Sequence, residues 1–176
     1  MSKWLCLVGG LLLVVTVQAQ AQDKAGKEPA NKAALESLKK LAGEWVAADK
    51  DGKPTDKVVS VIKVTAGGSA VQETLFPGQP QEMLSIYNRD GDDLIMTHYC
   101  ALGNQPRMKA DPNAPSNQIK WVFAGGTNLD PAKDMHMHSG TVTFVDDDHI
   151  EFTGEAWEGG KPSPNHCGTM KLVRKK

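Results

Sequence analysis

His98 occupies a position from which an imidazole could contact a bound molecule. The run 93–100 (DLIMTHYC) is typical of a β-strand. Side chains two residues apart on a strand point to the same face, so His98 shares a face with Leu94 and Met96. We expect this face to be the interior, which places His98 in a cavity near the end of its strand. The alternative is a core histidine whose two ring nitrogens are bonded by neighbouring groups.

A second pattern with ligand-binding potential is Asp134-Met135-His136-Met137-His138. On an extended strand, His136 and His138 share one face and the two methionines the other. Together with His98 they would supply three nitrogen ligands, enough for a zinc or copper site with an open position. Haem held by one histidine is a related possibility, although no haem-attachment motif is present. Alternatively, the two histidines form a polar outer face over an apolar inner one.

Three cysteines occur in the chain, and Cys6 lies in an apolar N-terminal run. Cys100 and Cys167 can therefore form a single disulfide in an oxidising compartment, or they can remain separate thiols. The sequence contains neither a Gly-x-Ser-x-Gly elbow nor a Walker-type phosphate loop. No catalytic residue is predicted from these patterns.

The N-terminus has the pattern of a secretory signal peptide. Lys3 precedes an apolar run from Trp4 to Val17, which is followed by the small-x-small sequence Ala19-Gln20-Ala21. The apolar run is shorter than the roughly 20 residues that a membrane-spanning helix needs. We therefore expect residues 1–21 to be a signal peptide, with no stable membrane anchor after cleavage and a periplasmic or extracellular location.

The composition points to one β-rich domain. The chain has 176 residues and a net charge of −1, so nucleic acid is not an expected partner. Its 17 glycines and 10 prolines favour many turns. Residues 22–32 are polar and small, which predicts a flexible leader. Apolar residues at three- and four-residue spacings predict a short helix over 33–41.

From Gly43 onward the pattern changes to period two, with turn residues between the runs. Segment 103–117 is predicted to be the longest irregular loop. The frequent spacing near ten residues predicts an antiparallel sandwich or barrel within a single domain, 33–176. The predicted strands are 44–48, 58–65, 70–76, 82–88, 93–100, 118–124, 135–145, 149–157 and 167–174.

The predicted helix leads into the motif Leu41-Ala42-Gly43-Glu44-Trp45 and then into the series of strands. This arrangement resembles the lipocalin and wider calycin superfamily. The resemblance implies a barrel in which a short helix closes one end and Gly43 permits a tight entry into the first strand. It also implies that Trp45 packs across the barrel floor beneath a basic side chain, for which Arg174, or alternatively Lys171, is the candidate.

Longer stretches are similar to a bacterial, mostly exported family of lipocalin-like domains whose function is not established. The resemblance covers about residues 34–174 and implies an all-β antiparallel barrel of about eight to ten strands with a short N-terminal helix. The family supplies no catalytic residue. The stretches that carry the resemblance are 66–70 with 73–78, 97–100, 103–108, 125–131 and 136–138.

The leading hypothesis is an exported barrel that binds a small, largely apolar molecule in its interior. One alternative is a metal- or haem-binding protein, possibly an enzyme, centred on His98, His136 and His138. Another is a filled barrel that acts as an interaction domain without a ligand. The residues predicted to face the ligand are Leu94, Met96, His98, Trp121 and Phe123, with Tyr99 and Arg107 at the rim.

Overall fold

The computed structural model describes residues 30–176; the predicted signal peptide and most of the predicted leader lie outside the described residues. Helix α1 (Ala30–Lys40) begins at Ala30 rather than at residue 33, so the end of the predicted leader is helical. The Asn31 side-chain amide anchors this first turn by donating to the carbonyl of Asp92 (2.9 Å). Within residues 30–176, no helix has the length and apolar character needed to cross a membrane.

Strands make up the rest of the chain, joined by short turns and two 3₁₀ turns, Ala66–Gly68 and Pro164–His166. All nine predicted strands are present, with small shifts at their ends. The strands are β1 (Gly43–Ala48), β2 (Pro54–Thr65), β3 (Ala70–Leu75), β4 (Met83–Asp90), β5 (Asp93–Tyr99), β6 (Gln105–Ala110), β7 (Gln118–Thr127), β8 (His136–Phe144), β9 (His149–Glu158), β10 (Lys161–Pro162) and β11 (Gly168–Arg174).

Strand β6 corrects the prediction that 103–117 is one irregular loop. Its sequence, QPRMKA, alternates between buried and exposed side chains: Pro106, Met108 and Ala110 face inward. The prediction failed because a proline and two basic residues obscure the period of two. Pro106 is tolerated at a register irregularity between β6 and β7, where the regular hydrogen-bonded ladder is already interrupted.

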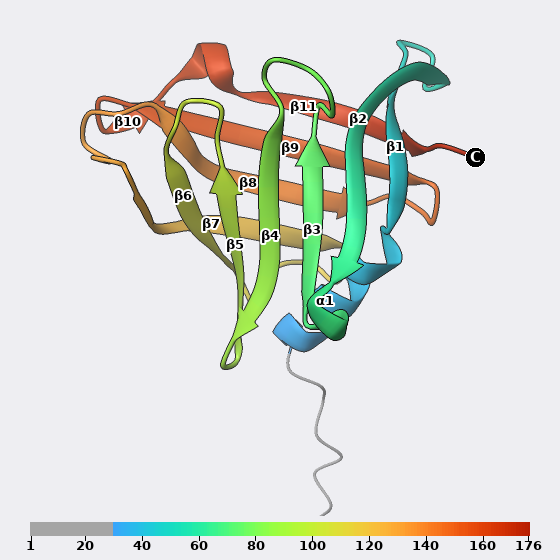
Figure 1. The fold of residues 1–176 in the computed structure, drawn as a ribbon, viewed down its shortest axis with the longest axis horizontal. Helices are drawn as coiled ribbons and strands as arrows, with labels where there is room; N and C mark the ends of the chain where they lie inside the picture. The colour runs from blue at the N-terminus through green and yellow to red at the C-terminus, as the bar shows by residue number, and fades with distance from the viewer. Residues whose placement is uncertain (1–29) are drawn as a thin grey trace, which may run out of the picture.

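The strands form a closed antiparallel barrel, which confirms the predicted fold class. Hydrogen-bonded neighbours follow the order β9-β11-β1-β2-β3-β4-β5-β6-β7-β8, and pairing of β8 with β9 closes the ring of ten strands. The two-residue strand β10 pairs only with the end of β9. In Figure 1, strands β2 to β5 in front cross β8, β9 and β11 behind at a steep angle, and α1 lies at one end. The architecture is compatible with a lipocalin-like barrel.

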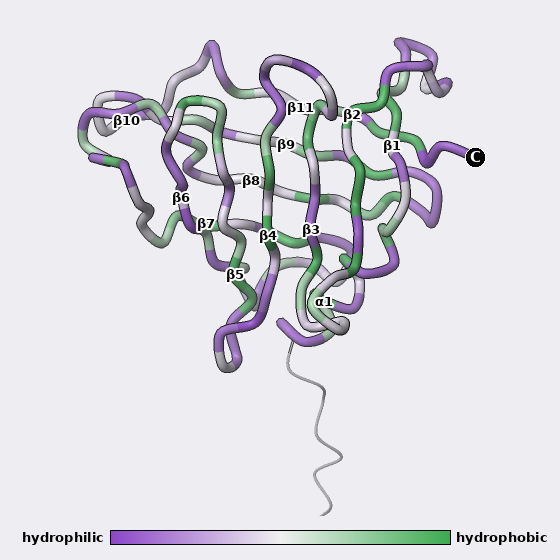
Figure 2. Tube along the Cα trace, viewed as in Figure 1, coloured by the Kyte–Doolittle hydropathy of each residue, from purple (hydrophilic) through white to green (hydrophobic). Residues whose placement is uncertain are grey.

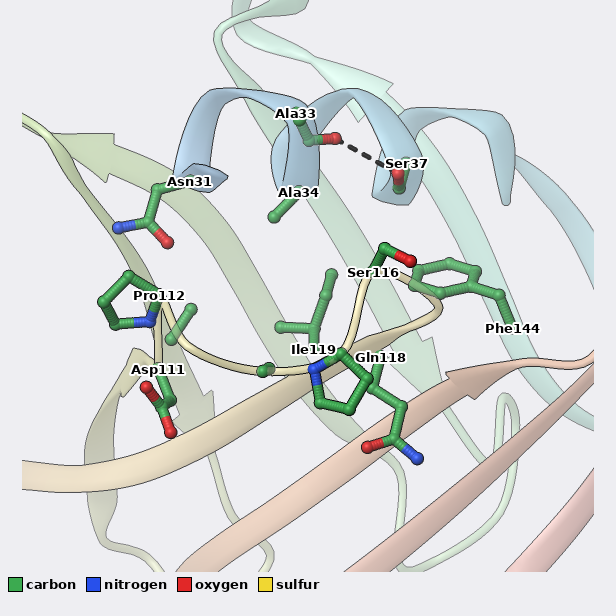
Figure 3. A pocket seen from close by; sticks show the side chains of 13 residues that line it. Asn31, Ala33, Ala34, Ser37, Asp111, Pro112, Ser116, Gln118, Ile119 and Phe144 are labelled. Atoms are coloured by element: carbon green, nitrogen blue, oxygen red, sulfur yellow. Dashed lines mark hydrogen bonds between the residues drawn. The ribbon is translucent and has the colours of Figure 1, made fainter. Parts of the chain in front are cut away.

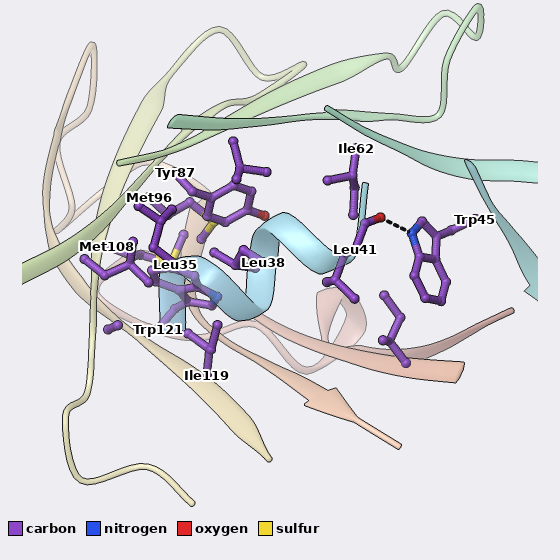
Figure 4. Packing of buried hydrophobic residues seen from close by; sticks show 14 of the residues in the cluster. Leu35, Leu38, Leu41, Trp45, Ile62, Tyr87, Met96, Met108, Ile119 and Trp121 are labelled. Carbon is purple, nitrogen blue, oxygen red and sulfur yellow. Dashed lines mark hydrogen bonds between the residues drawn. The ribbon is translucent and has the colours of Figure 1, made fainter. Parts of the chain in front are cut away.

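The interior near α1 is filled by apolar side chains. Leu35, Leu38 and Leu41 recur on one face of the helix and its C-terminal turn, and each is almost fully buried. They pack against strand residues that include Met108 and Trp121 (Figure 4). Hydrophobic segments recur along the strands, whereas the turns are mainly hydrophilic (Figure 2). The helix thus closes this end of the barrel.

Trp45 and Arg174 join the helix, the first strand and the last strand. The Arg174 guanidinium lies 4.5 Å from the centroid of the Trp45 ring, which confirms the predicted basic cover. Its nitrogens also donate to the carbonyls of Lys40 and Ala42, each at 3.0 Å. Trp45 Nε1 donates to the carbonyl of Leu41 (2.8 Å). We call this arrangement the Trp45–Arg174 clasp.

Gly43 is required by the same arrangement. Its φ of +135° lies in a region that side chains rarely adopt, and a Cβ atom there would lie 3.3 Å from Nη1 of Arg174. Lys171, the alternative candidate for the basic cover, instead pairs with Glu151 (3.4 Å). The sequence motif therefore has the structural role that the resemblance implied.

Replacing Arg174 with Met should lower the free energy of unfolding by about 1–3 kcal/mol, since it removes a cation–π contact and charge-assisted bonds to the helix C-terminus. Urea denaturation of the purified protein measures this loss. Lys171→Met is the matched control, and its exposed ion pair predicts a change within about 0.5 kcal/mol. Equal losses in the two variants would contradict the proposed role of the clasp.

Candidate binding site at the open end of the barrel

A groove of about 520 Å³ lies at the helix end of the barrel, between α1 and the loop that joins β6 to β7. Figure 3 shows Ala34 and Ser37 of the helix facing Pro112 and Ser116 of the loop. Asp111 is the single ionisable residue among those that line it. The other polar side chains of the groove, those of Asn31, Ser37, Ser116 and Gln118, are neutral.

A second cavity, of about 460 Å³, lies at the end of the barrel opposite to α1. It is bordered by the ends of β4 and β5, the start of β8, and the segments of β9 and β11 that face them. Its apolar lining is rich in flexible side chains. The main apolar residues are Met83, Leu102, Met135, Met137, Phe152 and Met170. Methionine fills irregular space and adapts to different shapes, which suits a ligand cavity.

His98 lines this cavity and is nearly inaccessible to solvent. Its Nδ1 shares a hydrogen bond with Oγ of Ser85 (2.9 Å) on the neighbouring strand. Burial lowers the pKa of His98 to about 4, because the charged form loses hydration inside the barrel. The imidazole is therefore neutral at pH 7 and can offer its other nitrogen to a ligand as a hydrogen-bonding group.

The remaining predicted binding residues are distributed over different parts of the molecule. Leu94 and Trp121 belong to the packed core near the helix, where Trp121 contacts Tyr87 at 5.4 Å between ring centroids. Met96 lines a small inner cavity rather than the open one. Tyr99 and Arg107 have exposed side chains and do not line the open cavity. Of the residues predicted to contact an apolar ligand, His98 alone lines the open cavity, and His136, predicted as a metal ligand, lines it as well.

The small inner cavity, of about 20 Å³, lies deeper in the barrel and contains a carboxyl group that the sequence reasoning missed. Glu73 lines it on β3 and accepts hydrogen bonds from Ser60 Oγ (2.6 Å) and from the Tyr87 hydroxyl. Loss of hydration raises the pKa of Glu73, although both hydrogen bonds act in the opposite direction. The inner and open cavities share Met137, Phe152 and Met170 as lining residues.

Strand register places these polar side chains in one row across the barrel wall. Glu73 is opposite Ser85 on β4, and Ser85 is opposite His98 on β5. Opposed residues on antiparallel strands project to the same face, so all three point inward. A sequence signal existed, because Glu73 stands two residues from Val71 and Leu75 at an inward position of an otherwise apolar face.

His136 and His138 form an aromatic cluster with Phe123 and Trp157. The His138 ring is sandwiched between Phe123 (4.7 Å between centroids) and Trp157 (3.8 Å), and its Nδ1 lies 3.1 Å from His136 Nε2. Desolvation, followed by the effect of His136, lowers the pKa of His138. The cluster lies where the pairing of β7 with β8 has ended and β8 contains a bulge.

This geometry corrects the predicted three-histidine metal centre. His98 is bonded to Ser85, whereas His136 and His138 are bonded to each other. Within residues 30–176, no three side chains of His, Cys, Asp or Glu lie in a metal-binding arrangement. His98 and His136 both line the open cavity, whereas His138 does not: it lies at the bulge in β8 and is stacked between Phe123 and Trp157.

Cys100 and Cys167 both line the open cavity but are not bonded to each other in the structure. Cys167 is exposed, and its thiol donates to the carbonyl of Ser163 (3.3 Å). Cys100 is partly buried at the end of β5. Of the two alternatives, a disulfide or separate thiols, the structure has separate thiols, although the fold brings both residues to one cavity.

The fold and the site together define a class: a closed antiparallel barrel with a packed end and an open end that carries a cavity. No family model matches the chain, and no curated protein matches its sequence. The functional assignment therefore depends on the geometry of the cavity.

His98 should make the protein less stable in acid. Its pKa is about 4 in the folded state and about 6.5 when unfolded, so only the unfolded state gains a proton between these values. The free energy of unfolding should fall by about 3 kcal/mol from pH 7 to pH 4 through this residue. Denaturant titrations across this range should show a weaker pH dependence in His98→Gln.

His149→Gln is the control for this comparison, because His149 is an exposed histidine at the opposite end of the barrel. It should retain most of the acid sensitivity of the wild-type protein. An unchanged pH dependence in a folded His98→Gln variant would show that His98 is not the source.

Proposed function

We propose that this protein is an exported carrier or sensor of a small, largely apolar molecule, which binds in the cavity at the open end of the barrel. The observation that carries the proposal is the 460 Å³ cavity, lined by methionines and Phe152 with His98 at its wall. Cavities of this size that combine apolar walls with a few polar groups are typical of small-molecule sites. The sequence resemblance to exported lipocalin-like domains supports the same proposal.

The division of the barrel interior favours this function over a filled interaction domain. Near α1 the space is occupied by core residues such as Trp121 and Met108, both almost fully buried. At the other end, side chains leave a cavity between β5 and the strands opposite. A barrel that served only as a stable scaffold would gain stability from filling this space as well.

A neutral apolar fluorophore, N-phenyl-1-naphthylamine, should bind the protein with one-to-one stoichiometry. Ala156 lines the cavity, so Ala156→Phe should weaken this binding by at least about tenfold by occupying the space. Val122→Phe places the same ring on the exposed outer face of β7 and should leave the affinity unchanged. Fluorescence titration measures the fluorophore affinity of both variants.

Leu102→Trp provides a second test at the exposed rim of the cavity, where a larger side chain is easily accommodated. It should also weaken binding. Equal affinity in folded Ala156→Phe and Val122→Phe would place the fluorophore outside the barrel, for example in the groove of Figure 3, and would contradict the proposed site.

Export is a separate part of the proposal. When the full-length chain is expressed in a bacterium, intact-mass measurement of the extracytoplasmic fraction should give a chain that begins at Gln22. Ala21→Phe should block cleavage, because signal peptidase requires a small residue there, whereas Gln20→Phe should be cleaved normally. Retention of the wild-type chain in the cytoplasm would contradict export.

A further inference from the structure

The inner carboxyl group has no cationic partner along the cavities. Glu73 is hydrogen-bonded only to neutral hydroxyl groups, those of Ser60 and Tyr87. No lysine or arginine of the described chain lines the inner or the open cavity. A carboxylate withdrawn from water is costly unless a charge or further donors compensate it. Within residues 30–176, the side chains that line the two cavities therefore provide no counter-ion for Glu73.

Space for that counter-ion exists beside Glu73. The inner cavity, at about 20 Å³, has room for one water-sized group. A carboxylate offers about four lone-pair positions, of which the hydroxyl groups of Ser60 and Tyr87 occupy two. Ser85 contributes a further oxygen to the lining, and Tyr87 and Phe152 add aromatic rings, which attract cations. An ammonium group matches this cavity in size, charge and hydrogen-bonding capacity.

We propose that the barrel binds a primary amine, with the ammonium group beside Glu73 in the inner cavity and an apolar body extending into the open cavity. This inference depends on the function proposed above and specifies its ligand class. Met137, Phe152 and Met170 line both cavities, so they mark the passage along which the apolar body would lie. The two methionines are flexible enough to move aside for it.

The charges that line the two cavities disfavour a ligand with a negatively charged group. Glu155 adds a second carboxyl group at the open cavity, whereas His98 is neutral at pH 7. A fatty-acid anion would therefore bring its charge toward two carboxyl groups without any permanently charged cation. A neutral alcohol would avoid this repulsion but would leave Glu73 uncompensated. The structure thus predicts that binding affinity decreases from the amine to the alcohol to the carboxylate.

The experiment compares three ligands that share one alkyl chain: octylamine, octanol and octanoate. Each is titrated against the full protein at pH 7 and detected both by displacement of N-phenyl-1-naphthylamine and by native mass spectrometry. Octylamine should bind at least about tenfold more tightly than the other two, as one buried charge pair predicts. Glu73→Gln should abolish this preference while changing fluorophore affinity less than about twofold.

Glu151→Gln is the matched control, because Glu151 pairs with Lys171 on the outside of the barrel. This variant should keep the full preference for octylamine. If the fluorophore binds and the three alkyl ligands bind equally, or octanoate binds best, the amine proposal is overturned and the proposed function stands. If neither the fluorophore nor any alkyl ligand binds, both proposals fail.

A pH series in the wild-type protein tests the same idea without a variant. Octylammonium affinity should fall as the pH is lowered and Glu73, whose pKa is raised by burial, becomes protonated, whereas octanol affinity should not. The groups facing Glu73 are Ser60 on β2, Ser85 and Tyr87 on β4, and apolar residues of β3, β5, β8, β9 and β11. The adjoining open cavity adds the titratable side chains of Glu155, His136 and His166. His98 lies behind Ser85 and titrates lower, at about 4. A pH-independent amine affinity would overturn the proposal.

Discussion

Closure of the sheet is the constraint on which the other features depend. Because β8 pairs with β9, every one of the ten barrel strands has two neighbours and the sheet has no free edge. Closure also fixes an interior volume that side chains must fill or leave open. Near α1, three leucines of the helix and its C-terminal turn complete the filling. Within residues 30–176, no α-helix lies at the other end, where the 3₁₀ turn Pro164–His166 borders the cavity that remains.

Interactions at the packed end, near α1, explain how the barrel keeps its fold while the other end is open. Arg174 of the last strand holds Trp45 of the first strand and the final carbonyls of α1, so three distant segments are joined at a single point. Most of the large buried residues, such as Trp121, lie at this end. The open end can therefore carry flexible methionines and loops, since stability is concentrated elsewhere.

How much of the structure could be predicted from the sequence depends on whether each feature is encoded locally or by residues far apart in the chain. Period-two alternation and glycine-rich turns are local, and they were sufficient for nine strands and for an antiparallel sandwich or barrel, whereas the choice of a barrel came from the resemblance. The Gly43–Trp45 motif also predicted a contact with Arg174 across the chain, because the resemblance supplied the pairing. The placement of His98 and His136 at one cavity, and of His138 outside it, depends on strand register and on a bulge in β8, and neither is encoded in a local pattern.

Glu73 shows how a site residue can be overlooked when polar residues are judged by type alone. Carboxylates are usually solvated, yet this one lies at an inward position, and register aligns it with Ser85 and His98. The row of three polar groups separates the apolar core from the open cavity. It therefore marks the depth at which the apolar lining meets hydrogen-bonding groups. For the ligand proposed above, the apolar walls would provide affinity, whereas this row would determine which polar group of the ligand can be accommodated.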